Sequence, residues 1–259
     1  MRFRVLSSGS SGNMTYIETK NTKIILDAGI GTNNFFAKYG IDLKTIDGVV
    51  ITHEHTDHTM SIKALLNRTQ APLYINKASY DLLLQKNPTI RAREIQYLEA
   101  NCQYLIGDIK VFTLLLNHDA ANCFGFIFAN NGEYLAYVTD TGVLAEPYLE
   151  LLKKADSIII EANHDTEMLL ESDRSWYLKQ RILSTDGHLS NQVCGTILNE
   201  VIKAHKVKTI VLAHLSGECN TEECAMDTVL KEIEGDYLPK FYIAKRRQPL
   251  PTLEVKHES

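Results

Sequence analysis

The chain has 259 residues, of which 44% are hydrophobic, and carries a formal net charge of −5 at pH 7. A chain of this length and apolar content can bury a large core, and we expect one domain spanning residues 1–259. The acidic balance excludes the overall basic surface of non-specific nucleic-acid binders, so any contact with nucleic acid must be local.

Composition also bears on the compartment. No segment approaches the roughly 20 apolar residues of a membrane span, and the first residues hold no apolar stretch of signal-peptide length. The cysteines are odd in number and lack C-x-x-C spacing, which is typical of reduced thiols that serve in packing: Cys102, Cys123, Cys194, Cys219 and Cys224. We therefore expect a cytosolic protein without a membrane partner.

The N-terminal segment predicts three strands, over residues 3–6, 14–18 and 23–26. The first two flank the turn-rich stretch S-S-G-S-S-G-N at residues 7–13. This stretch is either a hairpin connection or a loop whose small residues let the backbone approach a phosphate, although it lacks the lysine and the following helix of a P-loop. The third strand ends in Asp27-Ala28-Gly29.

A dense group of chemically active residues follows a predicted buried strand at residues 48–51. His53, His55, Asp57 and His58 lie between that strand and a helix predicted over 59–68. Because side chains alternate along a strand end, His53 and His55 point to the same side. Imidazole and carboxylate suit zinc, and also manganese or iron, and no cysteine stands in this stretch to favour a softer metal. The pattern predicts a site for two divalent ions, with a solvated histidine-rich turn as the alternative.

The next predicted strands also end in polar residues. After a strand at 72–75 and a helix at 78–85, the apolar strand 109–116 leads to His118. This repeats the geometry of the first group, so we expect a further ligand there, with a satisfied core histidine as the alternative. A hairpin over 124–129 and 133–138 turns at Asn130-Asn131-Gly132 and leads to Asp140, a residue type that often only forms a turn.

In the remaining chain, predicted strands that end in polar residues again alternate with predicted helices. Strand 157–161 ends at Glu161, helices are expected at 166–171 and 175–183, and we expect Ser190 to be the N-cap of an amphipathic helix. Strand 209–213 leads to His214 and is followed by a helix at 221–233. The basic cluster at residues 245–247 is a solvated strand end unless it has a binding role.

The stretch that holds His53, His55, Asp57 and His58 resembles the signature of the metallo-β-lactamase fold superfamily of hydrolases. The resemblance implies an α/β fold, a four-layer αβ/βα sandwich in a single domain, with a dinuclear metal site along one edge. The ions would be Zn²⁺ or Mn²⁺, or alternatively Fe²⁺. The resemblance assigns the ligands in order: His53, His55 and His118 for one ion, Asp57, His58 and His214 for the other, and Asp140 shared.

The same resemblance implies roles around the metals. A metal-bridging hydroxide would be the nucleophile, and Asp57 would accept a hydrogen bond from it. Asp27 would support the metal loop from behind. In tRNase Z-like enzymes of the superfamily, a Glu and a His are proposed to protonate the leaving oxygen, and Glu161 and His188 occur in that order here. An alkoxide leaves poorly without an acid, so this pair favours phosphodiester substrates.

Three motifs together resemble the branch typified by the YycJ/WalJ proteins: S-G-S-x-G-N in the N-terminal loop, E-A-N-H-D at 161–165 and G-H-L-S-N at 187–191. For this branch the resemblance implies a nuclease, more specifically an exonuclease, acting on nucleic acid. We count His164, Ser190 and Asn191 as candidate substrate contacts. His205 and His257 are expected to be solvated.

Two alternatives from other classes stay open. The acidic charge favours a small-molecule phosphodiesterase or a glyoxalase II-like thioesterase, although glyoxalase II adds a helical domain for which too little chain follows His214. A low-turnover metal-dependent sensor or adaptor is the other, and the complete ligand set counts against it. Antibiotic hydrolysis is disfavoured, since the best-known dinuclear β-lactamases carry Arg in place of His58 and Cys in place of Asp140.

Overall fold

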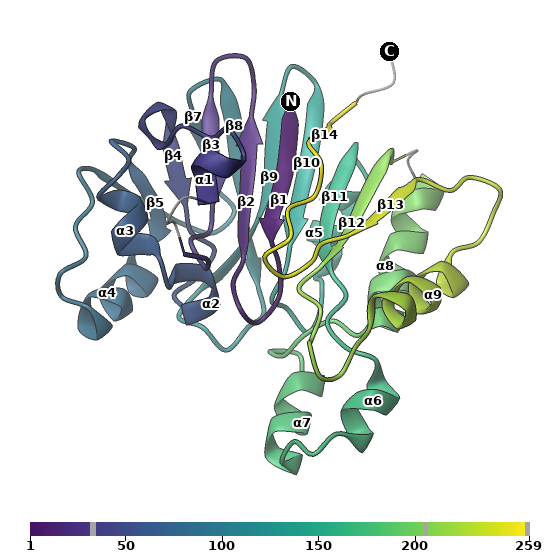
Figure 1. Ribbon diagram of the computed structural model, residues 1–259. Coiled ribbons are helices and arrows are strands. Elements are labelled where there is room, and N and C mark those ends of the chain that lie inside the picture. Colours follow the sequence, from purple (N-terminus) through teal and green to yellow (C-terminus); the bar gives the residue numbers. More distant parts are fainter. Residues whose placement is uncertain (32–34, 205–206, 257–259) are drawn as a thin grey trace.

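The computed structural model describes residues 1–31, 35–204 and 207–256, so the expectations for His205 and His257 lie outside the described residues. Within these ranges the chain forms two seven-stranded sheets that face each other (Figure 1). The first has the order β14-β1-β2-β3-β4-β5-β6 and the second the order β13-β12-β11-β10-β9-β8-β7. Every helix in the described ranges is too short or too polar to cross a bilayer.

The strands of the first sheet are β1 (Arg2–Ser7), β2 (Met14–Glu18), β3 (Lys23–Leu26), β4 (Gly48–Val50), β5 (Leu73–Asn76), β6 (Ile95–Leu98) and β14 (Leu253–Glu254). Those of the second are β7 (Gln103–Ile106), β8 (Ile109–Leu116), β9 (Cys123–Asn130), β10 (Glu133–Val138), β11 (Ser157–Glu161), β12 (Thr209–Ala213) and β13 (Lys240–Ile243).

Helices cover the outer face of each sheet. The first sheet carries α1 (Phe35–Lys38), α2 (Thr56–Thr59), α3 (Ile62–Leu66) and α4 (Lys77–Lys86), with a 3₁₀ turn at Leu43–Thr45. The second carries α5 (Glu146–Leu152), α8 (Asn191–Ala204) and α9 (Glu222–Glu232), while α6 (Thr166–Glu171) and α7 (Trp176–Leu183) project below it in Figure 1. The four-layer αβ/βα sandwich expected from the sequence is confirmed.

Three apolar clusters hold the layers together. One lies between the sheets, and the others lie between each sheet and its helices. Strand β9 shows how the sequence builds this, because Phe124, Phe126 and Phe128 alternate toward the central cluster while Ile127 faces the outer one. A strand that is buried on both faces reads as a continuous apolar run rather than an alternating one.

Strand direction explains where the polar residues gather. Strands β3 to β6 run parallel, as do β10 to β13. Strand β8 is antiparallel to β9, which is antiparallel to β10, so β8 and β10 share a direction. The carboxyl ends of β3 to β6 therefore share one edge of the first sheet, and those of β8 and β10 to β13 share one edge of the second. Residues that follow β4, β8, β10 and β12 meet there.

One predicted helix is wrong in form. The helix expected over 59–68 is split into α2 and α3, because the N–H of Ser61 donates to the carbonyl of Ala28 (2.8 Å) and that of Ala28 to the carbonyl of His58 (2.7 Å). These bonds fasten the segment to the loop after β3 instead of to its own preceding turn. The loop can approach so closely because Gly29 has no side chain: a Cβ there would meet the backbone of Asp57.

Candidate metal centre

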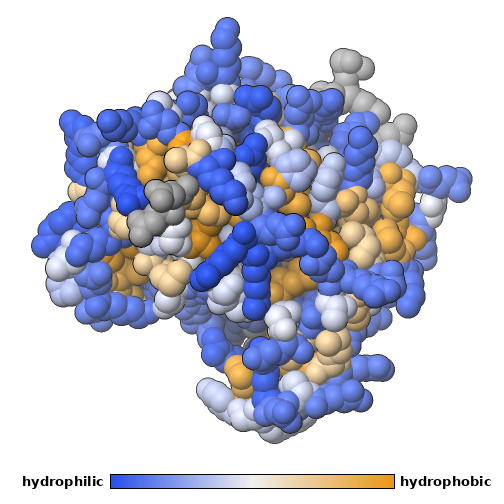
Figure 2. Space-filling view, viewed as in Figure 1, coloured by the Kyte–Doolittle hydropathy of each residue, from blue (hydrophilic) through white to orange (hydrophobic). Residues whose placement is uncertain are grey.

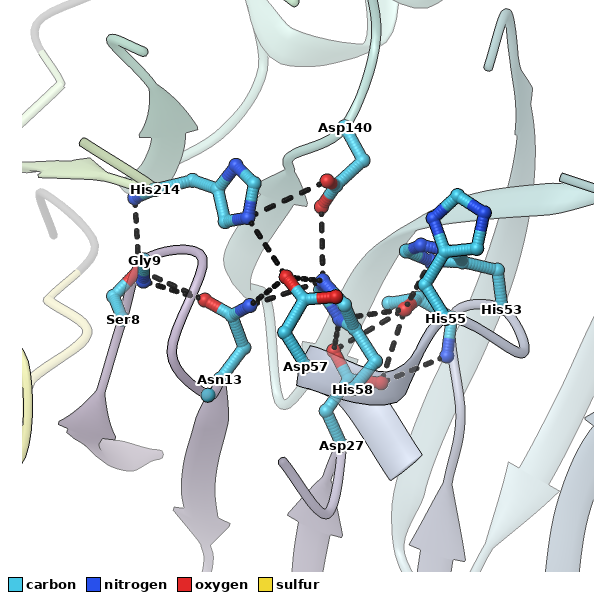
Figure 3. A network of polar contacts seen from close by, with 12 residues as sticks. Ser8, Gly9, Asn13, Asp27, His53, His55, Asp57, His58, Asp140 and His214 are labelled. Carbon is cyan, nitrogen blue, oxygen red and sulfur yellow. Dashed lines mark hydrogen bonds and ion pairs between the residues drawn. The ribbon is translucent and has the colours of Figure 1, made fainter. Parts of the chain in front are cut away.

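The polar strand ends converge on one small volume (Figure 3). His53, His55 and His118 form one cluster of potential ligand atoms, and Asp57, His58 and His214 form another. Asp140 lies between them, with its Oδ2 3.2 Å from Nε2 of His58 and its Oδ1 3.4 Å from Nε2 of His214. The structure thus brings together the residues expected as ligands, which are far apart in the sequence, and their division between two ions stays a prediction.

Unpaired buried atoms test whether this volume fits a cation. Among the described residues, Nε2 of His53 and Oδ2 of Asp140 are buried and have no hydrogen-bond partner. Leaving such atoms unpaired in a folded core is costly. A divalent ion would satisfy both, and imidazole with carboxylate is a donor set that such ions accept. The cluster therefore fits divalent metal binding.

Carboxylates behind the histidines fix which ring nitrogen faces the centre. Nδ1 of His58 donates to Oδ2 of Asp27 (2.7 Å), and Nδ1 of His214 donates to Oε1 of Glu161 (2.7 Å). With the proton on Nδ1, the lone pair of each Nε2 points into the cluster, as metal-binding histidines require. The supporting position expected for Asp27 is confirmed, and its other oxygen accepts from the backbone N–H of Thr52 (2.9 Å).

Backbone strain marks the same edge. Asp27, Asp140 and His214 all have left-handed φ angles, of 63°, 61° and 54°. This conformation costs a non-glycine residue roughly 1–2 kcal/mol. Each of the three follows a strand directly or by one residue. Strain of this kind persists where the surrounding structure holds it for function.

The carboxylates and histidines of the site shift one another's pKa values. Burial alone would raise the pKa of Asp140, but His214 and His58 outweigh it and hold that pKa well below its usual range. Asp57 behaves in the same way beside His58 and His214. Burial, reinforced by His58, lowers the pKa of His53 well below its usual value, so this ring is neutral. Against the effect of burial, the same carboxylates raise the pKa of His58, and that of His214 to about 10, so in the absence of metal both rings carry a second proton. A bound ion would displace that proton from Nε2 of each ring and find the carboxylates already anionic.

Glu161 serves two histidines at once. Its Oε1 accepts from Nδ1 of His188 (2.8 Å) as well as from His214, and its Oε2 accepts from the backbone N–H groups of Leu189 (3.1 Å) and Thr141 (3.3 Å). Burial would raise the pKa of Glu161, but the two histidines hold it at about 2. Burial lowers the pKa of His188, and the carboxylate of Glu161 more than reverses this, so the net shift is upward.

A cleft opens beside these groups. His118 and His188 line it together with Ser10, Asp119, Arg174 and Arg181. Arg181 forms an ion pair with Asp119, and Arg174 one with Glu218. The ring of His188 therefore stands at the boundary between the metal cluster and open space.

The N-terminal loop between β1 and β2 reaches the centre, which sequence reasoning did not foresee in detail. Asn13 donates through Nδ2 to Oδ2 of Asp57 (3.2 Å), and its Oδ1 accepts from the N–H of Gly9 (2.8 Å) and the hydroxyl of Ser8 (3.2 Å). Ser8 Oγ in turn accepts the backbone N–H of His214 (2.8 Å) (Figure 3). The loop thus joins ligands that come from different sheets.

Two further residues were missed. Glu54 is buried inside the histidine motif and accepts from the N–H of Ala121 (2.9 Å) and the hydroxyl of Ser79 (2.8 Å), which ties the His118 loop to the first motif. Cys123 lies with its Sγ 3.7 Å from Nδ1 of His53, so a cysteine does stand near the site. Burial raises the pKa of this thiol, which disfavours the thiolate that a metal would need.

Two of the three candidate substrate contacts, His164 and Asn191, are almost fully buried, and the third, Ser190, is half-buried. His164 is 1% exposed, and within the described ranges neither ring nitrogen has a hydrogen-bond partner. Asn191 is 1% exposed and its amide pairs with that of Asn220. Ser190 caps α8 by accepting from the N–H of Val193 (3.2 Å), which confirms the expected N-cap. A role in substrate binding stays a prediction for all three.

Comparisons with known proteins show the family of the chain. The model of the beta-lactamase superfamily domain matches residues 22–215. The chain is 33% identical to "Exodeoxyribonuclease YycJ" of Bacillus anthracis over 237 residues, which cover 90% of this chain and 89% of that protein. It is 31% identical to "Exodeoxyribonuclease WalJ" of Streptococcus pneumoniae serotype 2 over 237 residues, covering 90% and 88%.

Solved structures share the fold at low sequence identity. The metallo-beta-lactamase fold protein YhfI from Bacillus subtilis superposes with a TM-score of 0.72 at 15% identity, covering 96% of this chain and 99% of that one. The short form of human tRNase Z gives a TM-score of 0.68 at 18% identity, covering 99% and 100%. These likenesses concern the fold alone.

Proposed function

Because the chain belongs to the beta-lactamase superfamily and is a metal-dependent hydrolase, we propose that it is a dinuclear exonuclease that cleaves phosphodiester bonds in nucleic acid, with DNA as the preferred substrate. The observation that carries the proposal is the hydrogen bond between Glu161 and His188 at the edge of the cleft. Thioester hydrolysis has no need of such a proton donor, because a thiolate leaves readily, whereas a sugar alkoxide does not. The names of the two relatives favour DNA over RNA.

The residues would divide the work as follows. Two divalent ions, Zn²⁺, Mn²⁺ or Fe²⁺, held by the two histidine clusters with Asp140 shared, would lower the pKa of a water and neutralise charge on a phosphoryl oxygen. Asp57 accepts a hydrogen bond from the attacking water and orients it. His188 holds a proton on the cleft side of its ring and gives it to the leaving oxygen.

Glu161 positions and charges that acid. Its carboxylate fixes the Nδ1–H of His188 and raises the pKa of the ring, so that the imidazolium is available near neutral pH. The same oxygen accepts from His214, so the proton donor and the metal cluster are held in register by one buried side chain. Asn13 restrains Asp57 from the other side.

The test compares leaving groups and nucleic acids in one experiment. Protein loaded with Zn²⁺ or Mn²⁺ is incubated with single- and double-stranded DNA and RNA labelled at the 5′ or 3′ end, and with bis-p-nitrophenyl phosphate and a glutathione thioester. Stepwise shortening of DNA from one end is expected, with slower hydrolysis of RNA. Turnover of the thioester alone, or of the small phosphodiester without any nucleic acid, would refute the proposal.

A further inference from the structure

The basic turn at residues 245–248 lies against the N-terminal loop that touches the metal centre. The N–H of Ser8 donates to the carbonyl of Lys245 (3.1 Å), and the N–H of Arg247 donates to the hydroxyl of Ser7 (3.0 Å). A bridge between Lys245 and Gln248 closes the turn. In Figure 1 the yellow segment that joins β13 and β14 passes beneath the lower end of β1. The turn is therefore fixed in place beside the site rather than free in solvent.

Lys245 and Arg246 are the cations of this turn that line a hollow beside the N-terminal loop. Ser8, Leu215, Ser216, Gly217 and Arg246 are among the residues that line the hollow, and Ser216 also lines the cleft beside His188. The hollow and the cleft therefore lie on either side of Ser216. Figure 2 shows hydrophilic surface over the segment that joins β13 and β14.

Arg246 has no ion pair or hydrogen bond among the described residues, although its neighbour Lys245 is paired with Glu222. Glu222 is the carboxylate that shares the lining of the hollow, and that pairing offsets its charge. An exposed guanidinium with all its donors unused, next to a phosphodiester-cleaving centre, is suited to bind a phosphate through two parallel hydrogen bonds.

Two glycines make room for the guanidinium. A Cβ on Gly217 would lie 2.6 Å from Cζ of Arg246, and a Cβ on Gly9 would lie 3.2 Å from its Nε. Gly9 has a left-handed φ of 119° and needs glycine for that reason alone. Gly217 does not lie in that region, and the guanidinium of Arg246 packs over the space that a side chain there would take.

We propose that Arg246, seated over Gly217, forms a second phosphate-binding subsite that holds a nucleic-acid strand one or more phosphates away from the scissile bond. This inference rests on the proposed function and names how the substrate is held. The subsite takes the phosphate group itself, whether as an internal phosphodiester or as a terminal monoester. It supplies the local basic contact that an acidic protein needs to hold a polyanion.

The experiment measures kcat and KM of the metal-loaded protein on a single-stranded oligodeoxynucleotide and on bis-p-nitrophenyl phosphate, which has a single phosphate and none to place at a second subsite. Arg246→Ala is expected to raise KM for the oligonucleotide about ten-fold or more, the worth of a charge-assisted pair of hydrogen bonds, and to lower the salt slope of KM by about 1. The loss of kcat/KM on bis-p-nitrophenyl phosphate should be at least ten-fold smaller than the loss on the oligonucleotide. Metal content should stay at the wild-type level.

Three companion variants separate recognition from packing. Arg246→Lys keeps the positive charge but cannot form two parallel hydrogen bonds to a phosphate. The salt slope of KM should therefore stay as in the wild type, and KM should rise less than in Arg246→Ala. Gly217→Ala displaces the guanidinium without removing it and should behave like Arg246→Lys. Arg93→Ala, an exposed arginine before β6 at the opposite edge of the sheet, is the matched control and should match the wild type.

The outcomes decide between the inference and the function beneath it. If the wild type shortens the oligonucleotide and Arg246→Ala is no worse than Arg93→Ala, the subsite is refuted while the nuclease stands. Equal losses on both substrates, or a loss of metal, would mean that Arg246 only packs against the N-terminal loop, and would also refute it. Oligonucleotides with a 5′-phosphate, a 3′-phosphate or neither show which phosphate is bound.

If the wild type cleaves no oligonucleotide, the proposed function fails and binding decides the subsite. Fluorescence anisotropy of labelled octathymidylate with metal-free protein then gives the affinity. A ten-fold weaker affinity in Arg246→Ala than in Arg93→Ala upholds the subsite, and equal affinities, or no binding, refute it.

Discussion

Replacing His188 by alanine isolates the step that distinguishes phosphodiester chemistry in this site. His188 lies at the edge of the cleft with Nδ1 bound to Glu161, and its removal deletes the proton donor. Oε1 of Glu161 keeps its bond to His214, and Oε2 keeps both backbone donors, so the buried carboxylate remains paired. The metal cluster should therefore survive the substitution.

The expected loss follows from the role. A general acid contributes about 10² to 10⁴ in rate, or roughly 2.7 to 5.4 kcal/mol of barrier. We expect kcat on an oligodeoxynucleotide to fall by that factor in His188→Ala, while bis-p-nitrophenyl phosphate, whose leaving group needs no proton, loses about ten-fold or less. Added imidazole should restore part of the oligonucleotide rate, because it can enter the space that the ring leaves.

The assay is single-turnover cleavage of both substrates, with metal content measured on the same samples by mass spectrometry. Equal losses on the two substrates at full metal content would refute the assignment of His188 as the acid. A loss of metal together with both activities would show that this histidine is a ligand instead.

The remaining predictions concern the groups around it. Asp140→Ala should lower the metal content from two ions per chain to one or fewer, measured after reloading, since its carboxylate lies within reach of both clusters; unchanged content would contradict the bridge. Asp27→Asn should weaken metal binding about 10- to 100-fold in titration calorimetry, the usual cost of losing a carboxylate behind a histidine ligand; unchanged affinity would remove Asp27 from the site. His164→Gln should make stability less sensitive to acid. Burial lowers the pKa of His164 to about 4, so between that value and about 6.5 the unfolded chain binds more protons than the folded one, and stability is lost as pH falls. From pH 7 to pH 5 this group should cost about 2 kcal/mol in the metal-free wild type and nothing in the variant, measured by urea unfolding; parallel curves would contradict it.

The sequence was sufficient to predict which residues gather at the candidate metal centre, because these residues follow apolar strands and apolar runs can be recognised in a sequence. Strands β2, β3, β8 and β10 begin and end as expected from the sequence. Strands β6 and β7 were not predicted, because each has four residues with little buried surface and no clear alternation. Helix α5 was missed for a similar reason, since it begins without a capping side chain and carries a proline in its first turn.

The supporting residues could not be found by pattern because their partners are remote in sequence. Glu54 sits inside the histidine motif, yet its partners Ser79 and Ala121 come from a helix and from a loop of the other sheet. Glu161 was expected to act only with His188, and its second bond to His214 emerges only when β11 and β12 pair in parallel. Because of that bond, a substitution of Glu161 should disturb the metal cluster as well as the proton donor.

The N-terminal loop links the two sheets at the site through hydrogen bonds to residues from each of them. Asn13 can hold Asp57 only if its amide is oriented, and the donors that orient it, Gly9 N–H and the hydroxyl of Ser8, belong to the loop that also accepts the N–H of His214. A shift of one sheet against the other would therefore break a chain of hydrogen bonds and move ligands apart. Because buried atoms in the cluster stay unpaired until a cation binds, metal binding should stabilise the contact between the sheets as well as the centre itself.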